Sequence, residues 1–151
     1  GVDYRVEEHL DDETISIGDY VLTGGELPAK VVADAVARMI PGVLGATSGA
    51  IEDSFYHTVL ECPQYTKPQE YRGMMVPDIL LSGHHKHIEQ WRLEESLKRT
   101  ALLRHDLLQR ELTVDERKAL KRVLDRVDSE EEQQVLSKLI EQSTFIEEKR
   151  K

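Results

Sequence analysis

Two charged side chains, Asp53 and Arg38, could take part in acid–base chemistry. Asp53 is a carboxylate able to accept a proton, and Arg38 is a fixed cation able to stabilise an oxygen that becomes negative. Each also has an ordinary structural interpretation, because an arginine in a last helical turn interacts with the helix dipole and an aspartate before serine often forms a cap or turn. As a pair they are suited to general-base catalysis beside a developing negative charge, but they do not identify a reaction.

A glycine pair lies between two predicted elements and could face a ligand. The alternating pattern of residues 15–22 predicts a short strand, and the apolar spacing after Pro28 predicts a helix that stops at 41–42. Gly24 and Gly25 join the two, at the kind of junction where α/β sheets bind ligands, although a plain tight turn has the same pattern. Strand, turn and helix make half of a βαβ unit, so the sheet is incomplete in these residues.

Several histidines and one cysteine are candidate zinc ligands. His84 and His87 could share a helix face, and His85, His57 and Cys62 add to the set. No Cys-x-x-Cys or His-Glu-x-x-His pair accompanies them, so helix-start and surface histidines are the simpler interpretation.

Composition and charge narrow the class of protein. The chain has 151 residues and a net charge of −9. Residues 1–60 hold 11 acidic against 3 basic side chains, whereas residues 61–151 hold 18 against 17, so the second part is better suited to contact nucleic acid. Charged residues interrupt the most apolar stretch, 31–44, which argues against a membrane span, and the first residues do not resemble a signal peptide. We expect a cytoplasmic protein and, because the chain begins at Gly1 and not at Met, a piece of a longer one.

The second part of the sequence predicts turns followed by helices. Small polar residues at 46–54 predict a linker, and the prolines and glycines of 55–83 predict extended and turn structure. A helix is expected at 86–99, supported by the charge pairs Glu94–Lys98 and Glu95–Arg99.

Two further helices are predicted by capping boxes at Thr113–Glu116 and Ser129–Glu132. Trp91 is more typical of a core side chain than of a base-stacking platform. The first capped helix carries a basic run that is either a solvated face or an RNA contact, formed by Arg117, Lys118, Lys121, Arg122 and Arg126.

Five segments, taken together, resemble one enzyme family. In chain order they read ISIGDYVLTGGELP at 15–28, RMIPGVLG at 38–45, EDSF at 52–55, PQYTKP at 63–68 and LLSGHH at 80–85. From residue 1 to about residue 104 the chain closely resembles the bacterial tRNA (guanine-N1)-methyltransferases, members of the trefoil-knotted SPOUT methyltransferase superfamily. The later helices fit the family's variable C-terminal end in type only.

The resemblance implies an α/β knotted methyltransferase domain followed by a small all-α domain. Residues 1–45 would be the C-terminal part of the knotted S-adenosylmethionine-binding domain, 46–54 the interdomain linker and 55–151 a helical tRNA-binding domain. The N-terminal half of family members has no counterpart here, which would explain the incomplete sheet. Family members work as homodimers in which the active site is shared between subunits.

The resemblance also assigns site residues. Asp53 and Arg38 match the family's catalytic pair, with Asp53 as the base and Arg38 as the group that stabilises charge on guanine O6. Contacts to tRNA would come from Ser54, Lys67 and Arg92. Lys67 stands where the family has arginine and His84 where asparagine is usual, and both departures concern tRNA contacts more than methyl transfer. The cofactor loop would consist of Ser16, Ile17, Gly18, Tyr20, Leu22, Gly24 and Gly25.

The resulting hypothesis is methylation of N1 of the guanosine at position 37 of tRNA, next to the anticodon, by the full-length protein. S-adenosylmethionine would be the methyl donor, and the family suggests Mg²⁺ as a further cofactor. The alternatives are a non-catalytic RNA-binding module, if the N-terminal half is truly absent, and a small zinc protein built on the histidines.

Overall fold

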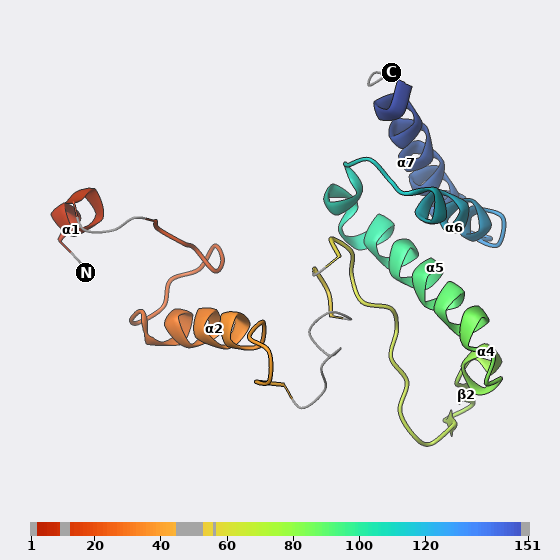
Figure 1. Cartoon of the computed structure of the whole chain (residues 1–151), viewed down its shortest axis with the longest axis horizontal. Helices are drawn as coiled ribbons and strands as arrows, with labels where there is room; N and C mark the ends of the chain where they lie inside the picture. Colours follow the sequence, from red (N-terminus) through yellow and green to blue (C-terminus); the bar gives the residue numbers. More distant parts are fainter. Residues whose placement is uncertain (1–2, 10–12, 45–52, 56, 149–151) are drawn as a thin grey trace. The chain divides into compact units, whose positions relative to one another are not determined.

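The computed structural model describes residues 3–9, 13–44, 53–55 and 57–148 of the chain, with side chains up to Gln142. Contacts divide the chain into two units, Gly1–Thr47 (unit 1) and Ser48–Lys151 (unit 2) (Figure 1). None of the helices in the described ranges combines the length and the apolar character needed to cross a membrane.

The described part of unit 1 forms the helices α1 (Tyr4–His9) and α2 (Glu26–Ala37). The strand predicted at 15–22 is wrong, because residues 13–25 run as bends and irregular chain and no described residue of unit 1 is in a strand. A strand is held by hydrogen bonds to a neighbouring strand, and an alternating pattern cannot supply that neighbour.

Helix α2 confirms the predicted helix. It begins at Glu26, so Pro28 lies in the first turn, where a missing N–H removes no helix hydrogen bond. No side chain of α2 is buried, and Val36 and Met39 are 59% and 53% exposed. Within the described part of unit 1, nothing covers the apolar face that the spacing predicts.

Three helices build the core of unit 2, namely α5 (His85–Leu103), α6 (Val114–Leu124) and α7 (Glu130–Glu148), and each contacts the other two (Figure 1). The short 3₁₀ helix η1 (His105–Leu108) follows α5. The structure confirms the helix predicted at 86–99 from charge pairs and the two helices predicted from capping boxes. The buried apolar residues are Leu97, Ala101, Leu108, Leu112, Ala119, Leu120, Val123, Val127, Leu136 and Leu139.

A small β-hairpin precedes these helices, so unit 2 is mostly helical and not all-α as predicted. Strand β1 (Glu70–Tyr71) pairs antiparallel with β2 (Met74–Met75). Arg72 and Gly73 between them have φ of 52° and 80°, as the tightest hairpin turns require. The one-turn helix α4 (Asp78–Leu81) then leads towards α5.

The capping box predicted for the start of α6 is confirmed. The Thr113 hydroxyl accepts a hydrogen bond from the Glu116 N–H at 3.2 Å, and the Glu116 carboxylate accepts one from the Thr113 N–H at 2.7 Å. Arg110 holds the same carboxylate, with Nη2 2.7 Å from Oε1. The first turn of α6 is therefore held both by its own capping box and by the side chain of Arg110.

The predicted ion pair between Glu94 and Lys98 is wrong. Glu94 is 2% exposed and lies against α6, where its carboxylate accepts a hydrogen bond from Arg122 Nε at 2.6 Å and pairs with Arg126. Lys98 instead pairs with Glu132 of α7 at 3.0 Å. Residues four apart on a helix compete with residues on packed neighbours, and a buried carboxylate pairs with the neighbour that it faces.

Candidate functional site

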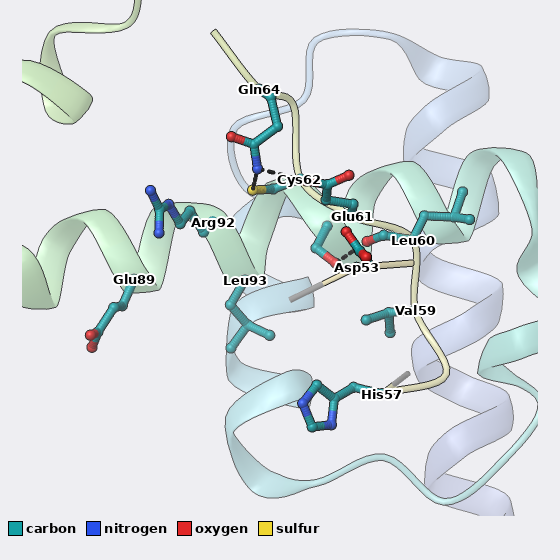
Figure 2. Close-up of a pocket in the computed structure, with 11 residues that line it drawn as sticks. Asp53, His57, Val59, Leu60, Glu61, Cys62, Gln64, Glu89, Arg92 and Leu93 are labelled. Carbon is teal, nitrogen blue, oxygen red and sulfur yellow. Dashed lines mark hydrogen bonds between the residues drawn. The ribbon is translucent and has the colours of Figure 1, made fainter. Parts of the chain in front are cut away.

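Asp53 lies beside a cavity of about 280 Å³ in unit 2 (Figure 2). One wall is the chain that follows Asp53, and the other is the face of α5 that carries Arg92, Leu93 and Ser96. Ligand sites in proteins have volumes from about 300 Å³ upwards, so this cavity is close in size to the smallest of them. The lining residues are Asp53, His57, Val59, Leu60, Glu61, Cys62, Gln64, Glu89, Arg92, Leu93 and Ser96.

The chain from Ser54 to Glu61 closes on itself in a compact turn, which we call the 54–61 turn. Ser54 Oγ accepts a hydrogen bond from the Glu61 N–H at 2.9 Å, and the Phe55 N–H donates to the Val59 carbonyl oxygen at 2.9 Å. Phe55 and Thr58 have φ of 74° and 59°, a conformation that non-glycine residues rarely adopt. Such backbone persists where surrounding contacts hold it, and it is frequent at functional sites.

Two hydroxyls of α5 hold the 54–61 turn through the main chain of Leu60. The Ser96 hydroxyl donates to the Leu60 carbonyl oxygen, and the Leu60 N–H donates to Thr100 Oγ1 at 2.9 Å. Thr100 Oγ1 in turn donates to the Ser96 carbonyl oxygen at 2.7 Å. Ser96 and Thr100 are 8% and 0% exposed, so both hydroxyls lie on the buried side of α5.

Arg110 makes a third attachment of the 54–61 turn to the rest of unit 2. Its Nε donates to Thr58 Oγ1 at 2.9 Å, while its other nitrogens bind Glu116 in the capping box of α6. The side chain that fixes the start of α6 thereby also holds the tip of the turn.

The cavity combines carboxylates, a cation and a thiol. Burial raises the pKa of the Cys62 thiol, and the nearby charge of Arg92 only partly opposes that shift. Cys62 is therefore protonated at neutral pH and is no nucleophile. Asp53 can accept a proton and Arg92 can bind an anion on the same cavity, an arrangement suited to a substrate with an acidic N–H and a nearby phosphate.

Lys67 lines a different hollow, of about 500 Å³, beside the β-hairpin. Tyr65, Tyr71 and Met74 lie on the same hollow, and Gln64 lines both cavities. A cation among aromatic side chains is a combination that single-stranded nucleic acids favour. Of the three predicted tRNA contacts, Arg92 lines the same cavity as Asp53, and Ser54 directly follows Asp53 in the sequence. Lys67 lies on the second hollow.

Arg38 belongs to unit 1, whereas Asp53 belongs to unit 2. It is the half-buried residue that ends α2, and its N–H donates to the Asp34 carbonyl oxygen at 3.1 Å. Its pairing with Asp53 stays a prediction.

The predicted cofactor loop is an exposed stretch that leads into α2. Ser16 Oγ bonds both backbone groups of Gly18, at 3.2 and 3.3 Å, and the Tyr20 hydroxyl donates to the Ile17 carbonyl oxygen at 3.4 Å. Gly25 directly precedes α2, and a side chain there would meet no atom within 4 Å. The backbone of Gly18 is thus bonded within the loop, whereas Gly25 leaves open space in front of the N-terminus of α2.

The zinc hypothesis finds no support in the described ranges. His84 and His87 stack with ring centroids 5.7 Å apart, but no group of three or more His, Cys, Asp or Glu side chains there could hold a metal ion.

The basic run predicted on the first capped helix offers fewer cations to RNA than its sequence indicates. Two of its five members, Arg122 and Arg126, bind the buried Glu94.

Sequence reasoning missed Ser96 and Thr100, although one signal was present. Both hydroxyls lie next to buried apolar residues, Leu97 and Ala101, at positions four apart on α5. Polar side chains on the buried face of a helix need partners, and here the partner is a backbone segment far away in sequence.

The known proteins to which this chain is similar all belong to one enzyme family. A family model described as tRNA (Guanine-1)-methyltransferase TrmD matches residues 1–110. The tRNA (guanine-N(1)-)-methyltransferase of Desulforamulus reducens is 62% identical over 121 residues, which cover 80% of this chain and 48% of that protein. Those of Brevibacillus brevis (58% over 120 residues, 80% and 49%) and Bacillus cereus strain AH820 (54% over 124 residues, 82% and 51%) are similar to it as well.

The chain spans about half the length of these curated relatives. The family model nevertheless matches most of the chain, including the glycine pair, Arg38, Asp53 and the first helix of the unit 2 core. The chain therefore belongs to the tRNA (guanine-1)-methyltransferase TrmD family.

Proposed function

We propose that this chain is part of an enzyme that methylates N1 of the guanosine at position 37 of tRNA, next to the anticodon. The observation that carries the proposal is the position of Asp53, on a cavity that also holds Arg92, in a member of this family. A full-length protein would use S-adenosylmethionine as methyl donor and would work in the cytoplasm, where tRNA is found.

The chemistry assigned to Asp53 and Arg38 follows from guanine. N1 carries a proton with a pKa well above 7, so a base must remove it as the new bond forms. Asp53 takes that proton in this proposal, and Arg38 stabilises the negative charge that develops on O6. The two residues would meet in a homodimer whose active site is shared between subunits.

The residues of the predicted cofactor loop fit a nucleoside in part. The hydroxyls of Ser16 and Tyr20 shape the loop by bonding its own backbone, and Gly25 leaves open space directly in front of α2. Bound there, S-adenosylmethionine supplies a methyl group activated by a sulfonium. This chain's residues would bind and orient it, and the remaining walls would come from the rest of a full-length protein. Mg²⁺ is a further cofactor that the family suggests.

The proposed tRNA contacts lie on unit 2. Arg92 would bind a phosphate near the target nucleotide, Ser54 would contact the same region, and Lys67 would bind backbone further away. Residues 61–151 carry nearly equal numbers of acidic and basic side chains, so they suit contacts to phosphates better than the strongly acidic residues 1–60.

The test uses a completed protein, in which this chain is joined to the part of the D. reducens relative that lies outside the matched region. We expect it to methylate a tRNA with guanosine at position 37 and not the same tRNA with adenosine there. Asp53→Asn should lower kcat by about a hundredfold or more, as loss of a general base does. Asp128→Asn, at an exposed position before α7, is the matched control and should leave kcat unchanged.

The chain matches only about half of its relatives' length, so a non-catalytic RNA-binding module is the alternative function to test. Binding of tRNA without methyl transfer by the completed protein would favour that alternative. Full activity of Asp53→Asn would instead remove Asp53 from the role of base.

A further inference from the structure

We propose that Ser96 and Thr100 are positioning residues for Asp53, which they hold in place through the main chain of Leu60. The assignment rests on the proposed function for the role of Asp53 and on contacts within unit 2 for everything else. Neither residue touches the substrate in this proposal, and neither is a catalytic residue.

The attachment satisfies both backbone polar groups of one residue. Ser96 donates to the carbonyl oxygen of Leu60, and Thr100 accepts from its N–H, so two side chains perform what a neighbouring strand would do in a sheet. Because Ser96 and Thr100 are four residues apart, they face the same side of α5, and the bond from Thr100 to the Ser96 carbonyl oxygen aligns the threonine hydroxyl.

A short path leads from this attachment to Asp53. Leu60 is followed by Glu61, whose N–H is bonded to Ser54 Oγ, and Ser54 follows Asp53 directly. Ser96 and Asp53 also line the same cavity. Fixing Leu60 therefore fixes the end of the 54–61 turn that carries the base.

The turn depends on outside support. Phe55 and Thr58 adopt positive φ without being glycine, and this strained backbone makes other conformations competitive once a support is lost. Removal of the Thr100 hydroxyl leaves the Leu60 N–H without its buried partner, so Leu60 would move towards water and take the turn with it. Small displacements of a catalytic group lower kcat strongly.

The experiment compares Thr100→Val, which keeps the shape and loses the hydroxyl, with Thr100→Ser, which keeps the hydroxyl. In the completed protein we expect Thr100→Val to lower kcat about tenfold, with KM for tRNA and for S-adenosylmethionine within about twofold of wild type. Thr100→Ser should restore kcat to within about twofold. Ser96→Ala serves as a second variant with the same expected direction.

Two further measurements separate positioning from stability. Val127→Ala removes core volume between α6 and α7 without removing a hydrogen bond of the 54–61 turn, and should lower the melting temperature while leaving kcat unchanged. Amide hydrogen exchange should be about tenfold faster at Leu60 and Glu61 in Thr100→Val than in Val127→Ala.

Each result has a defined meaning. Normal kcat in Thr100→Val with faster exchange at Leu60 would show that the attachment exists but does not position Asp53, and unchanged exchange would refute the attachment itself. A completed wild-type protein that lacks methyl transfer would refute the proposed function and the positioning role together, whereas the exchange data would still decide whether α5 holds the turn.

Discussion

At the scale of single residues, Glu94 shows how a buried charge is accommodated in unit 2. Burial would raise the pKa of its carboxyl, but hydrogen bonds from Arg122 and Gln90 and the charges of Arg126 and Arg122 outweigh burial, so the pKa lies below its usual value. The carboxylate links α5 to α6, while the two arginines remain about half exposed. Glu94 is therefore the group whose removal matters most in this cluster.

We expect Glu94→Gln to lower the free energy of unfolding by about 2 kcal/mol, because charged hydrogen bonds become neutral ones. A group whose pKa is lower in the folded state stabilises the fold above its unfolded pKa, and that contribution is lost as pH falls through the folded value. Urea unfolding between pH 7 and pH 3 should therefore show a steeper loss of stability for wild type than for Glu94→Gln.

The control for this prediction is Glu132→Gln, which removes the more exposed pair with Lys98. It should cost less than about 1 kcal/mol. Equal costs for the two variants would contradict the special role of the buried carboxylate.

The predicted tRNA contacts give a second expectation at this scale. In the completed protein, Lys67→Gln and Arg92→Gln should each reduce the slope of log affinity for tRNA against log salt by about one contact. Arg126→Gln should change the slope much less, because the Arg126 side chain binds Glu94. Filter-binding titrations at several salt concentrations measure the slopes, and unchanged slopes for Lys67 and Arg92 would exclude them from the interface.

At the scale of elements, local signals predicted what local interactions determine. The apolar spacing of α2 and the capping box at Thr113 involve residues within one or two turns, and the structure confirms both helices. Helix α5 was predicted from two charge pairs, and it is present although the pair Glu94–Lys98 does not form. The strand at 15–22 and the Glu94–Lys98 pair were wrong for a common reason: a partner distant in sequence, or its absence, decides both. No local pattern records such a partner.

The same distinction applies to the candidate site. Resemblance pointed to Asp53 and Arg92, which the structure brings to one cavity. The attachment of the 54–61 turn to α5 could not be predicted, because the hydrogen bonds that join Leu60 to Ser96 and Thr100 cross about forty residues of sequence.

Loss of the α6 cap should be measurable. Thr113→Ala removes the hydroxyl that accepts from the Glu116 N–H, and we expect a loss of about 1 kcal/mol, or about 4–8 °C in melting temperature. Thermal unfolding followed by circular dichroism at 222 nm reports the change. Thr113→Ser keeps the cap and should lose less than half as much; equal losses would argue against the hydroxyl as the cause.

At the scale of the whole molecule, the two units differ in how much they bury. Ten apolar side chains form a core among the described residues of unit 2, whereas no described side chain of unit 1 is buried. Ordering the predicted cofactor loop around a ligand would cost about 1–2 kcal/mol of conformational free energy per residue. A site that lacks some of its walls makes too few contacts with the ligand to offset that cost.

We therefore expect the 151-residue chain alone to keep a folded unit 2 but not to bind S-adenosylmethionine appreciably, whereas the completed protein binds it. Isothermal titration calorimetry of both proteins is the measurement. Micromolar binding by the 151-residue chain would mean that the loop around Gly24 and Gly25 is preformed.

The attachment of Leu60 by its main chain also bears on which substitutions the turn tolerates. Ser96 and Thr100 bind the amide groups of Leu60 and not its side chain, so almost any amino acid at position 60 can make the same two hydrogen bonds. Proline is the exception, since it has no N–H to give to Thr100. In a saturation library of the completed protein, position 60 should accept varied apolar residues and reject proline, while position 100 should accept little beyond serine. The two hydrogen bonds at Leu60 thus depend on the side chains of α5 and not on the side chain at position 60.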